Sequence, residues 1–310
     1  MQRREVLNSL AAAGLTGAAS IQALRTPPAA AATATAVSRV LTPWIESRDG
    51  TRLHWTQWGV GRPILFLNSS GANTQMWDYQ LVTFADQGYR CICFDRRGHG
   101  LSERPAAGYE YDTFADDLDS VIKALDLKSV TVVSHSMGAG EIVRYLTRHG
   151  SSRVARIVLI SPTTPYLTKS ADNPNGVPNS VFEALHVSWR KDFPKWVVDN
   201  TAQFFTPETS AAMKQWGSAL LLQCSLPVVI ACHKATTATD FRADLSRISV
   251  PALVIHGDLD VSAPLELTGR PTAVLISGCQ LNVYHNAPHG LMFTHMEMLN
   301  ADILRFIRNT

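Results

Sequence analysis

Residues 130–141, VTVVSHSMGAGE, lead from an apolar β-type run through serines, a histidine and glycines into a segment with helical spacing. At a sharp turn from strand to helix, a strained backbone lifts one side chain above the sheet, and small residues are needed two positions before and after it. Around Ser136 these positions hold Ser134 and Gly138. Around Ser134 they would include Val132, which is β-branched and belongs inside the strand. Ser136 is therefore the candidate nucleophile of such a turn, and a strand end merely capped by serines is the alternative.

The rest of the chain alternates strands with helices. A hairpin is predicted within residues 42–59, where two short alternating segments are joined by Arg-Asp-Gly. Further strands are expected at 62–70, 89–95, 128–134, 154–161, 251–257 and 281–286, and the main helices at 77–88, 111–127, 137–150 and 291–307. Continuous apolar strands between helices indicate an α/β fold, with a mostly parallel sheet covered on both faces. Such sheets bind ligands at the carboxyl ends of their strands.

Two helix ends carry capping signals. Gly88 follows the segment 77–87 and predicts a C-cap. Thr113 stands three residues before Asp116, a capping-box-like pattern at the start of the helix expected at 111–127.

One stretch interrupts the alternation of strands and helices. Residues 162–248 have helix-like spacing and no clear strand, so we interpret them as a helical lid inserted between two strands, called the lid segment below. The α/β core then comprises residues 37–161 and 249–310. The aromatic side chains of the lid segment either line a pocket or pack the lid on the core, and the sequence leaves both alternatives open. They are Trp189, Phe193, Trp196, Phe204, Phe205 and Trp216.

A serine hydroxyl becomes a good nucleophile when a histidine takes its proton, and a carboxylate must hold that histidine in the right tautomer. His289 lies in the loop between the last strand and the last helix. Asp258 and Asp260 follow the preceding strand, so the chain order is Ser, Asp, His, as this sheet arrangement requires. Asp260 is favoured over Asp258 because it lies deeper in its loop.

Four other histidines fit the role of proton acceptor less well. His99, in a turn, and His256, at the end of a strand, are expected to be structural. His285 is at a strand end and His295 is inside the terminal helix, so neither sits in a loop over the site.

The composition excludes several classes of protein. The 310 residues are 45% hydrophobic and 17% charged, which is typical of a soluble globular chain, and no apolar run after the first forty residues approaches the roughly 20 residues of a membrane span. Cys91 and Cys93 alternate within one expected strand and predict small buried apolar side chains instead of a disulfide. No cysteine or histidine spacing suggests a metal site.

The N-terminus is typical of an export signal. Arg3 and Arg4 precede a mildly apolar Ala/Gly-rich stretch, and small residues of a cleavage region follow. This resembles a bacterial twin-arginine signal, with Gln2 where Ser or Thr is more usual, and predicts a cleaved peptide over residues 1–36 and a periplasmic or secreted protein. The alternative is a disordered Ala-rich tail or an isolated helix.

Removing residues 1–36 takes away three of 28 basic and one of 26 acidic residues, which leaves 25 of each. An electrically neutral domain argues against binding to nucleic acid or an anionic membrane.

With these residues in place, the chain from about 44 to 308 resembles the α/β-hydrolase superfamily. More narrowly, it is similar to the cofactor-free (non-heme) chloroperoxidases and aryl esterases. The matching stretches are MWDYQ, FDRRGHGLS, SHSMG, VIHGDLDVSAP and APHGLMFTHMEMLNADILRFI.

The resemblance implies a catalytic triad of Ser136, Asp260 and His289, and no cofactor. It also implies an oxyanion hole made by the backbone N–H groups of Ser70 and Met137. The sequence departs from the family here, because Asn68 and Ser69 replace the usual His-Gly and Ser70 stands at the donor position. A backbone donor does not depend on its side chain, but a small polar Ser70 is expected to open and wet the acyl pocket.

Two classes of function follow from this. The first is a serine hydrolase of small carboxylic esters through an acyl-enzyme, with perhydrolysis as a further activity when hydrogen peroxide replaces water. The second is a non-catalytic binding or sensor protein, motivated by the altered loop at 68–70. Dehalogenases and epoxide hydrolases of this fold are disfavoured, because they place a carboxylate where Ser136 stands. The substrate, and whether the chain forms homo-oligomers, are left open.

Overall fold

The computed structural model describes residues 42–310. The predicted export signal, residues 1–36, lies outside the described residues. Eight strands form one sheet in the order β1-β2-β4-β3-β5-β6-β7-β8. The two pairs β1–β2 and β2–β4 are antiparallel and all others are parallel. The strands are β1 Trp44–Glu46, β2 Arg52–Trp58, β3 Arg62–Leu67, β4 Tyr89–Phe94, β5 Val130–His135, β6 Val154–Ile160, β7 Ala252–Gly257 and β8 Gln280–Tyr284.

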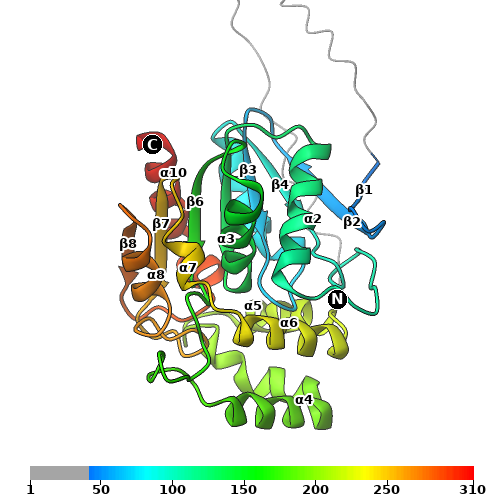
Figure 1. Ribbon diagram of the computed structural model, residues 1–310, viewed down its shortest axis with the longest axis vertical. Coiled ribbons are helices and arrows are strands. Elements are labelled where there is room, and N and C mark those ends of the chain that lie inside the picture. Colours follow the sequence, from blue (N-terminus) through cyan, green and yellow to red (C-terminus); the bar gives the residue numbers. More distant parts are fainter. Residues whose placement is uncertain (1–41) are drawn as a thin grey trace, which may run out of the picture. The chain divides into compact units, whose positions relative to one another are not determined.

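Helices cover both faces of this sheet, and four more lie between β6 and β7 in the chain. The covering helices are α1 Asp78–Asp86, α2 Tyr111–Ala124, α3 Met137–His149, α8 Gly269–Leu275, α9 Leu291–Thr294 and α10 Met296–Asn309. The lid segment contains α4 Asn179–Asn200, α5 Ala211–Leu222, α6 Leu226–Ala238 and α7 Arg242–Leu245. Two short 3₁₀ helices are η1 Thr74–Trp77 and η2 Thr201–Gln203. Figure 1 shows α4, α5 and α6 gathered at one end of the sheet, with α4 farthest from the strands.

Strand β3 shows how the sheet divides its side chains between two hydrophobic cores. Leu65 and Leu67 join the core formed with α2 and α3, whereas Ile64 and Phe66 join the core formed with α1 and α10. Both sets are fully buried, as the continuous apolar run predicts for a strand covered on both faces. The α/β fold expected from the sequence is confirmed.

The alternation along β4 places Cys91 and Cys93 in the same core, both completely buried, and all five cysteines are free. Among the described residues, no single helix is both long and apolar enough to cross a bilayer. Helices α5 and α6 reach that length and composition only together, as a pair bent by 89°.

One capping signal and one helix interior differ from the prediction. Helix α2 begins at Tyr111, as the predicted range 111–127 has it, but its N-cap residue is Glu110 and not Thr113, whose hydroxyl donates to the Glu110 carboxylate. The terminal helix is interrupted at His295, whose backbone leaves the helical region between α9 and α10. His295 therefore lies between two helices, whereas the prediction placed it inside one continuous helix.

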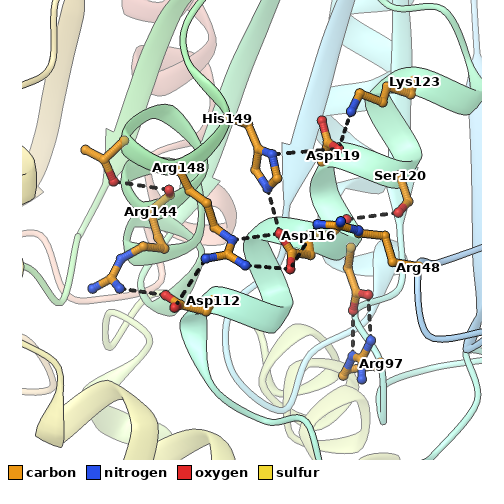
Figure 2. Close-up of polar contacts among 12 residues, drawn as sticks. Arg48, Arg97, Asp112, Asp116, Asp119, Ser120, Lys123, Arg144, Arg148 and His149 are labelled. Carbon is orange, nitrogen blue, oxygen red and sulfur yellow. Dashed lines mark hydrogen bonds and ion pairs between the residues drawn. The ribbon is translucent and has the colours of Figure 1, made fainter.

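Charged side chains hold α2 against α3 on their outer face (Figure 2). The guanidinium of Arg148 donates to both oxygens of Asp116, at 2.8 and 3.0 Å, and Nε2 of His149 lies 2.7 Å from Oδ1 of the same carboxylate. Arg144 donates to Asp112 at 2.6 Å. Asp116 is therefore the centre of a network of charges, which is worth more than an isolated surface pair.

We predict that Asp116→Asn lowers the free energy of unfolding by about 0.5–1 kcal/mol at pH 7. The hydrogen bond from Arg148 lowers the pKa of Asp116. The stabilisation is therefore complete above the unfolded-state pKa of about 3.9 and is lost as the pH falls through the lower folded-state pKa. Urea unfolding of both proteins at pH 7 and at pH 3 measures this, and the difference should shrink at pH 3. Asp126→Asn, at an exposed carboxylate, is the control and should have a smaller effect. An equal loss at both pH values would contradict the prediction.

Candidate active site

Ser136 forms the whole turn between β5 and α3. Its backbone has φ 55° and ψ −118°, a combination of angles that residues other than glycine rarely adopt. The turn is held on both sides, because the N–H of Ser136 donates to the carbonyl of Ile160 at 2.9 Å and its own carbonyl accepts from the N–H of Ala139 at 3.1 Å. A strained residue held in this way projects its side chain away from the strand and the helix.

The surroundings of Ser134 and Gly138, two positions before and after Ser136, show why these residues must be small. A Cβ atom on Gly138 would lie 3.0 Å from the carbonyl oxygen of Leu67 and 3.1 Å from that of Asn68. Ser134 is completely buried, and its hydroxyl donates to the carbonyl of Val158 at 3.3 Å. The serine that replaces the usual glycine therefore fits and has a hydrogen-bond partner.

Asp260 and His289 form a buried pair. Oδ2 of Asp260 lies 2.6 Å from Nδ1 of His289, and Oδ1 accepts from the N–H groups of Ser262 and Ala263 at 3.0 and 2.8 Å. Burial alone would raise the pKa of Asp260, but the imidazoles of His289 and His256 outweigh it and hold this pKa well below the usual value. An ionised Asp260 therefore accepts the Nδ1–H of His289, which leaves Nε2 free to take a proton.

Two further histidines support this pair, and sequence reasoning did not assign them this role. Nε2 of His256 lies 3.2 Å from Oδ2 of Asp260 and 2.7 Å from the carbonyl oxygen of Ala263. The Nε2–H of His135 donates to the backbone carbonyl of His289 at 2.9 Å, and the two rings lie 4.5 Å apart. Burial, together with the neighbouring His289, lowers the pKa of His135 well below its ordinary value, so this ring is neutral. The position of His135, directly before the candidate nucleophile, was the available signal in the sequence.

The competing candidates lie elsewhere. Asp258 pairs with His285 at 2.7 Å on the surface, where the His285 side chain is 84% exposed.

His99 is buried in the turn after β4, where its Nδ1 lies 3.0 Å from the carbonyl oxygen of Arg97 and its Nε2 accepts from the N–H of Gly71 at 3.1 Å. Burial and the neighbouring charge of Arg96 lower the pKa of His99 to about 3, so its Nε2 can act as an acceptor.

The loop after β3 contains the residues that depart from the family pattern. The Asn68 side chain is buried, donates to the carbonyl of Phe94 at 3.0 Å and accepts from the indole N–H of Trp77 at 3.0 Å. The N–H of Ser69 contacts the sulfur of Met76 at 3.4 Å. Within the described part of the chain, the N–H of Ser70 has no acceptor, so it is available to a ligand.

A cavity of about 460 Å³ brings the candidate residues together, since Ser136, His289, Ser70 and Met137 all line it. Residues 42–310 contain no hydrogen bond between the hydroxyl of Ser136 and His289; catalytic hydrogen bonds are often long without substrate. The cavity is also lined by five of the six aromatic residues singled out in the lid segment: Trp189, Phe193, Trp196, Phe204 and Phe205. Trp216 instead packs against Tyr79 and Phe293, with ring centroids 6.0 and 5.6 Å apart.

Comparison with known proteins identifies the family. A family model described as alpha/beta hydrolase fold matches residues 62–295, and the chain belongs to this family. A non-heme chloroperoxidase of Kitasatospora aureofaciens is 38% identical over 272 residues, covering 86% of this chain and 99% of the relative. A bifunctional esterase/perhydrolase of Acinetobacter calcoaceticus is 31% identical, covering 86% and 99%. The structure of an esterase from Exiguobacterium antarcticum superimposes with a TM-score of 0.82 at 31% identity, covering 86% and 98%. The chain is therefore an enzyme of the α/β-hydrolase class, and the resemblance to non-heme chloroperoxidases is confirmed.

The strained backbone at Ser136 predicts an unusual ranking of variants. Glycine tolerates positive φ, so Ser136→Gly should be more stable to urea than Ser136→Ala by about 1 kcal/mol. The same two replacements at Ser134, inside β5, should show the opposite order, because glycine weakens a strand. If alanine were the more stable replacement at position 136 as well, the strain at this turn would be negligible.

Proposed function

We propose that the protein is a serine esterase in which Ser136, His289 and Asp260 form the catalytic triad. The observation that carries the proposal is the buried Asp260–His289 pair, which opens on the same cavity as a serine held on a strained turn. A histidine whose Nδ1 is bound by an ionised carboxylate has Nε2 available as a general base. The relatives named esterase and perhydrolase support this class of reaction.

In the proposed reaction, the Ser136 hydroxyl oxygen attacks the ester carbonyl carbon while its proton passes to Nε2 of His289. The N–H groups of Ser70 and Met137 bind the negative oxygen of the tetrahedral intermediate. Met137 is the first residue of α3, so its N–H has no acceptor within the helix and lies where the helix dipole is positive. His289 then returns the proton to the leaving alcohol, and water hydrolyses the acyl-enzyme by the same steps in reverse order.

Hydrogen peroxide can take the place of water in the second half of this reaction. The acyl group then passes from Ser136 to peroxide, and the products are the free serine and a peracid. The peracid oxidises a halide ion to hypohalous acid and is itself reduced to the carboxylic acid. The relatives named non-heme chloroperoxidase and esterase/perhydrolase support this second activity.

The lining of the cavity favours a substrate with an apolar part. Beside Ser136 and His289, most of the lining residues are aliphatic or aromatic, and most of those come from the lid segment. A cavity of about 460 Å³ accommodates a small aryl or alkyl ester. Ser70 adds one polar side chain near the reacting carbonyl and does not change this apolar character.

We predict that Ser136→Ala lowers the turnover of p-nitrophenyl acetate by at least about 10³-fold, because the nucleophile is lost. Ser134→Ala, two residues away, is the matched control and should keep most of the activity, since its hydroxyl bonds only to the backbone of β6. A fluorophosphonate probe should label the wild type and not Ser136→Ala. Equal turnover in wild type and Ser136→Ala, with no labelling, would favour a binding protein instead. Acetate, hydrogen peroxide and bromide added to the same two variants test the perhydrolase reaction, and halogenation should require Ser136.

We further predict that Asp260→Asn lowers kcat by about 10²–10⁴-fold, because asparagine cannot hold the Nδ1–H tautomer of His289. Asp258→Asn is the control, since Asp258 pairs with an exposed histidine and should leave kcat within about twofold of the wild type. The pKa of Asp260 is far below neutral, so loss of its charge should not limit activity down to about pH 5 in the wild type. A larger loss in Asp258→Asn than in Asp260→Asn would reverse the assignment.

A further inference from the structure

The side chain of Arg96, in the turn after β4, lies between the Ser70 loop and helix α3. Its Nε and Nη2 donate to Oε2 of Glu141 at 2.9 and 2.6 Å. Nη2 also donates to the carbonyl of Asn68 at 2.8 Å, and Nη1 donates to the carbonyl of Ser69 at 3.3 Å. The guanidinium further lies 5.6 Å from the ring centre of Phe114 on α2. One buried cation therefore binds two consecutive carbonyls of the loop and one carboxylate of the helix.

These bonds fix the loop on the N-terminal side of Ser70, and His99 fixes it on the other side. Arg96 donates to the carbonyls of residues 68 and 69, and Nε2 of His99 accepts from the N–H of Gly71 at 3.1 Å. The N–H of Ser70 is left without an acceptor in the described chain, and Ser70 lines the cavity. The turn that carries Arg96 and His99 thus sets the direction in which this one N–H points.

The bond between Arg96 and Glu141 also restrains helix α3, which begins with the second proposed donor, the N–H of Met137. It is the fifth residue of α3 and Met137 is the first, so a rigid helical turn joins them. The first turn of α3 also packs closely on the loop, because a Cβ atom on Gly138 would lie 3.1 Å from the carbonyl oxygen of Asn68. The bonds from Arg96 therefore connect the backbone beside Ser70 with the helix that begins at Met137.

We infer that the Arg96–Glu141 ion pair is a positioning device that sets the separation and direction of the two oxyanion-hole donors, Ser70 N–H and Met137 N–H. This inference rests on the proposed function. Such donors stabilise the transition state only when they already point at the oxygen on which charge develops. A shift of about 1 Å in their spacing is enough to cost about 10²-fold in rate.

The neighbouring residue provides a matched control. Arg97 forms an equally buried ion pair with Asp117, since the side chains of Arg96, Glu141, Arg97 and Asp117 are all at most 2% exposed. Arg97, however, donates to Asp117 on α2 and to Asp49 near β2, and to no carbonyl of the Ser70 loop. A general requirement for a buried charge in this turn would affect both arginines, whereas positioning of the donors involves Arg96 alone.

The experiment compares Arg96→Lys with Arg97→Lys on p-nitrophenyl acetate, at a temperature where melting curves show both to be folded. Lysine keeps the charge but lacks the planar fork that reaches two carbonyls and a carboxylate together. Arg96→Lys should lower kcat about 10- to 100-fold with KM within about threefold of the wild type, and should slow labelling by a fluorophosphonate by a similar factor. Arg97→Lys should lose thermal stability and keep kcat. Wild-type kcat in folded Arg96→Lys would overturn the inference, and so would an equal loss in the two variants.

A second variant covers the case in which Arg96→Lys does not fold. Replacing Arg96 and Glu141 together by methionine removes both buried charges, a change that is often neutral or stabilising. The folded double variant should still show the reduced kcat, because methionine cannot bind the two carbonyls, and recovery of wild-type kcat would overturn the inference. Wild type and Ser136→Ala, assayed in parallel, separate this outcome from failure of the proposed function, in which the wild type itself would show no serine-dependent turnover.

Discussion

The site depends on one backbone constraint, the reversal at Ser136 between β5 and α3. A residue with φ 55° and ψ −118° can follow a strand directly and begin a helix without any intervening loop. The helix is thereby brought so close to the end of β3 that a Cβ atom at position 138 would lie 3.0 Å from the carbonyl oxygen of Leu67, a tight contact. The same closeness places the first free N–H of α3 beside the loop of Ser70. The placement of Ser136 at the turn and the immediate start of the helix are thus consequences of a single strained residue, whose cost of about 1–3 kcal/mol the surrounding structure supports.

Buried charges and imidazoles then fix the groups around this turn. Asp260 accepts three hydrogen bonds, two from backbone N–H groups and one from His289, and Nε2 of His256 lies 3.2 Å from its Oδ2, so its carboxylate has little freedom to rotate. Arg96 is likewise bound through all three of its nitrogen atoms. Unpaired buried charges are costly, and a fully bonded charge in a medium of low dielectric holds its partners in a narrow range of directions. The polar turn FDRRGHG, residues 94–100, can lie against the hydrophobic core because buried charged groups such as Arg96 have hydrogen-bond partners there.

The sequence predicted the parts of this arrangement that follow from local rules. The apolar runs located the strands, and the small residues around position 136 selected Ser136 over Ser134, because both patterns reflect nearest-neighbour geometry. The capping role of Thr113 was wrong because its hydroxyl binds the Glu110 side chain, a contact that competes with the capping pattern. The roles of Arg96, His135 and His256 were not predictable, since each acts across 4–154 positions of the chain through contacts that only the folded sheet creates. Whether an aromatic residue of the lid segment lines the cavity also depends on helix packing, which separated Trp216 from the other five.

The loop at 68–70 carries Ser70, the proposed donor, and departs from the sequence that the family resemblance implies. Asn68 and Ser69 stand where the family resemblance implies His-Gly, yet the Asn68 side chain bonds to the carbonyl of Phe94 and to the indole of Trp77, so the loop stays attached to β4 and η1. What matters for an oxyanion is the backbone, and here the backbone carbonyls are held by Arg96 and not by the residues that changed. Ser70 and the lid segment line the cavity, whereas Arg96 and Glu141 do not. The side chains that hold this loop backbone are therefore different from the lid-segment side chains that line the cavity, so a change in the lid lining need not disturb the backbone beside Ser70.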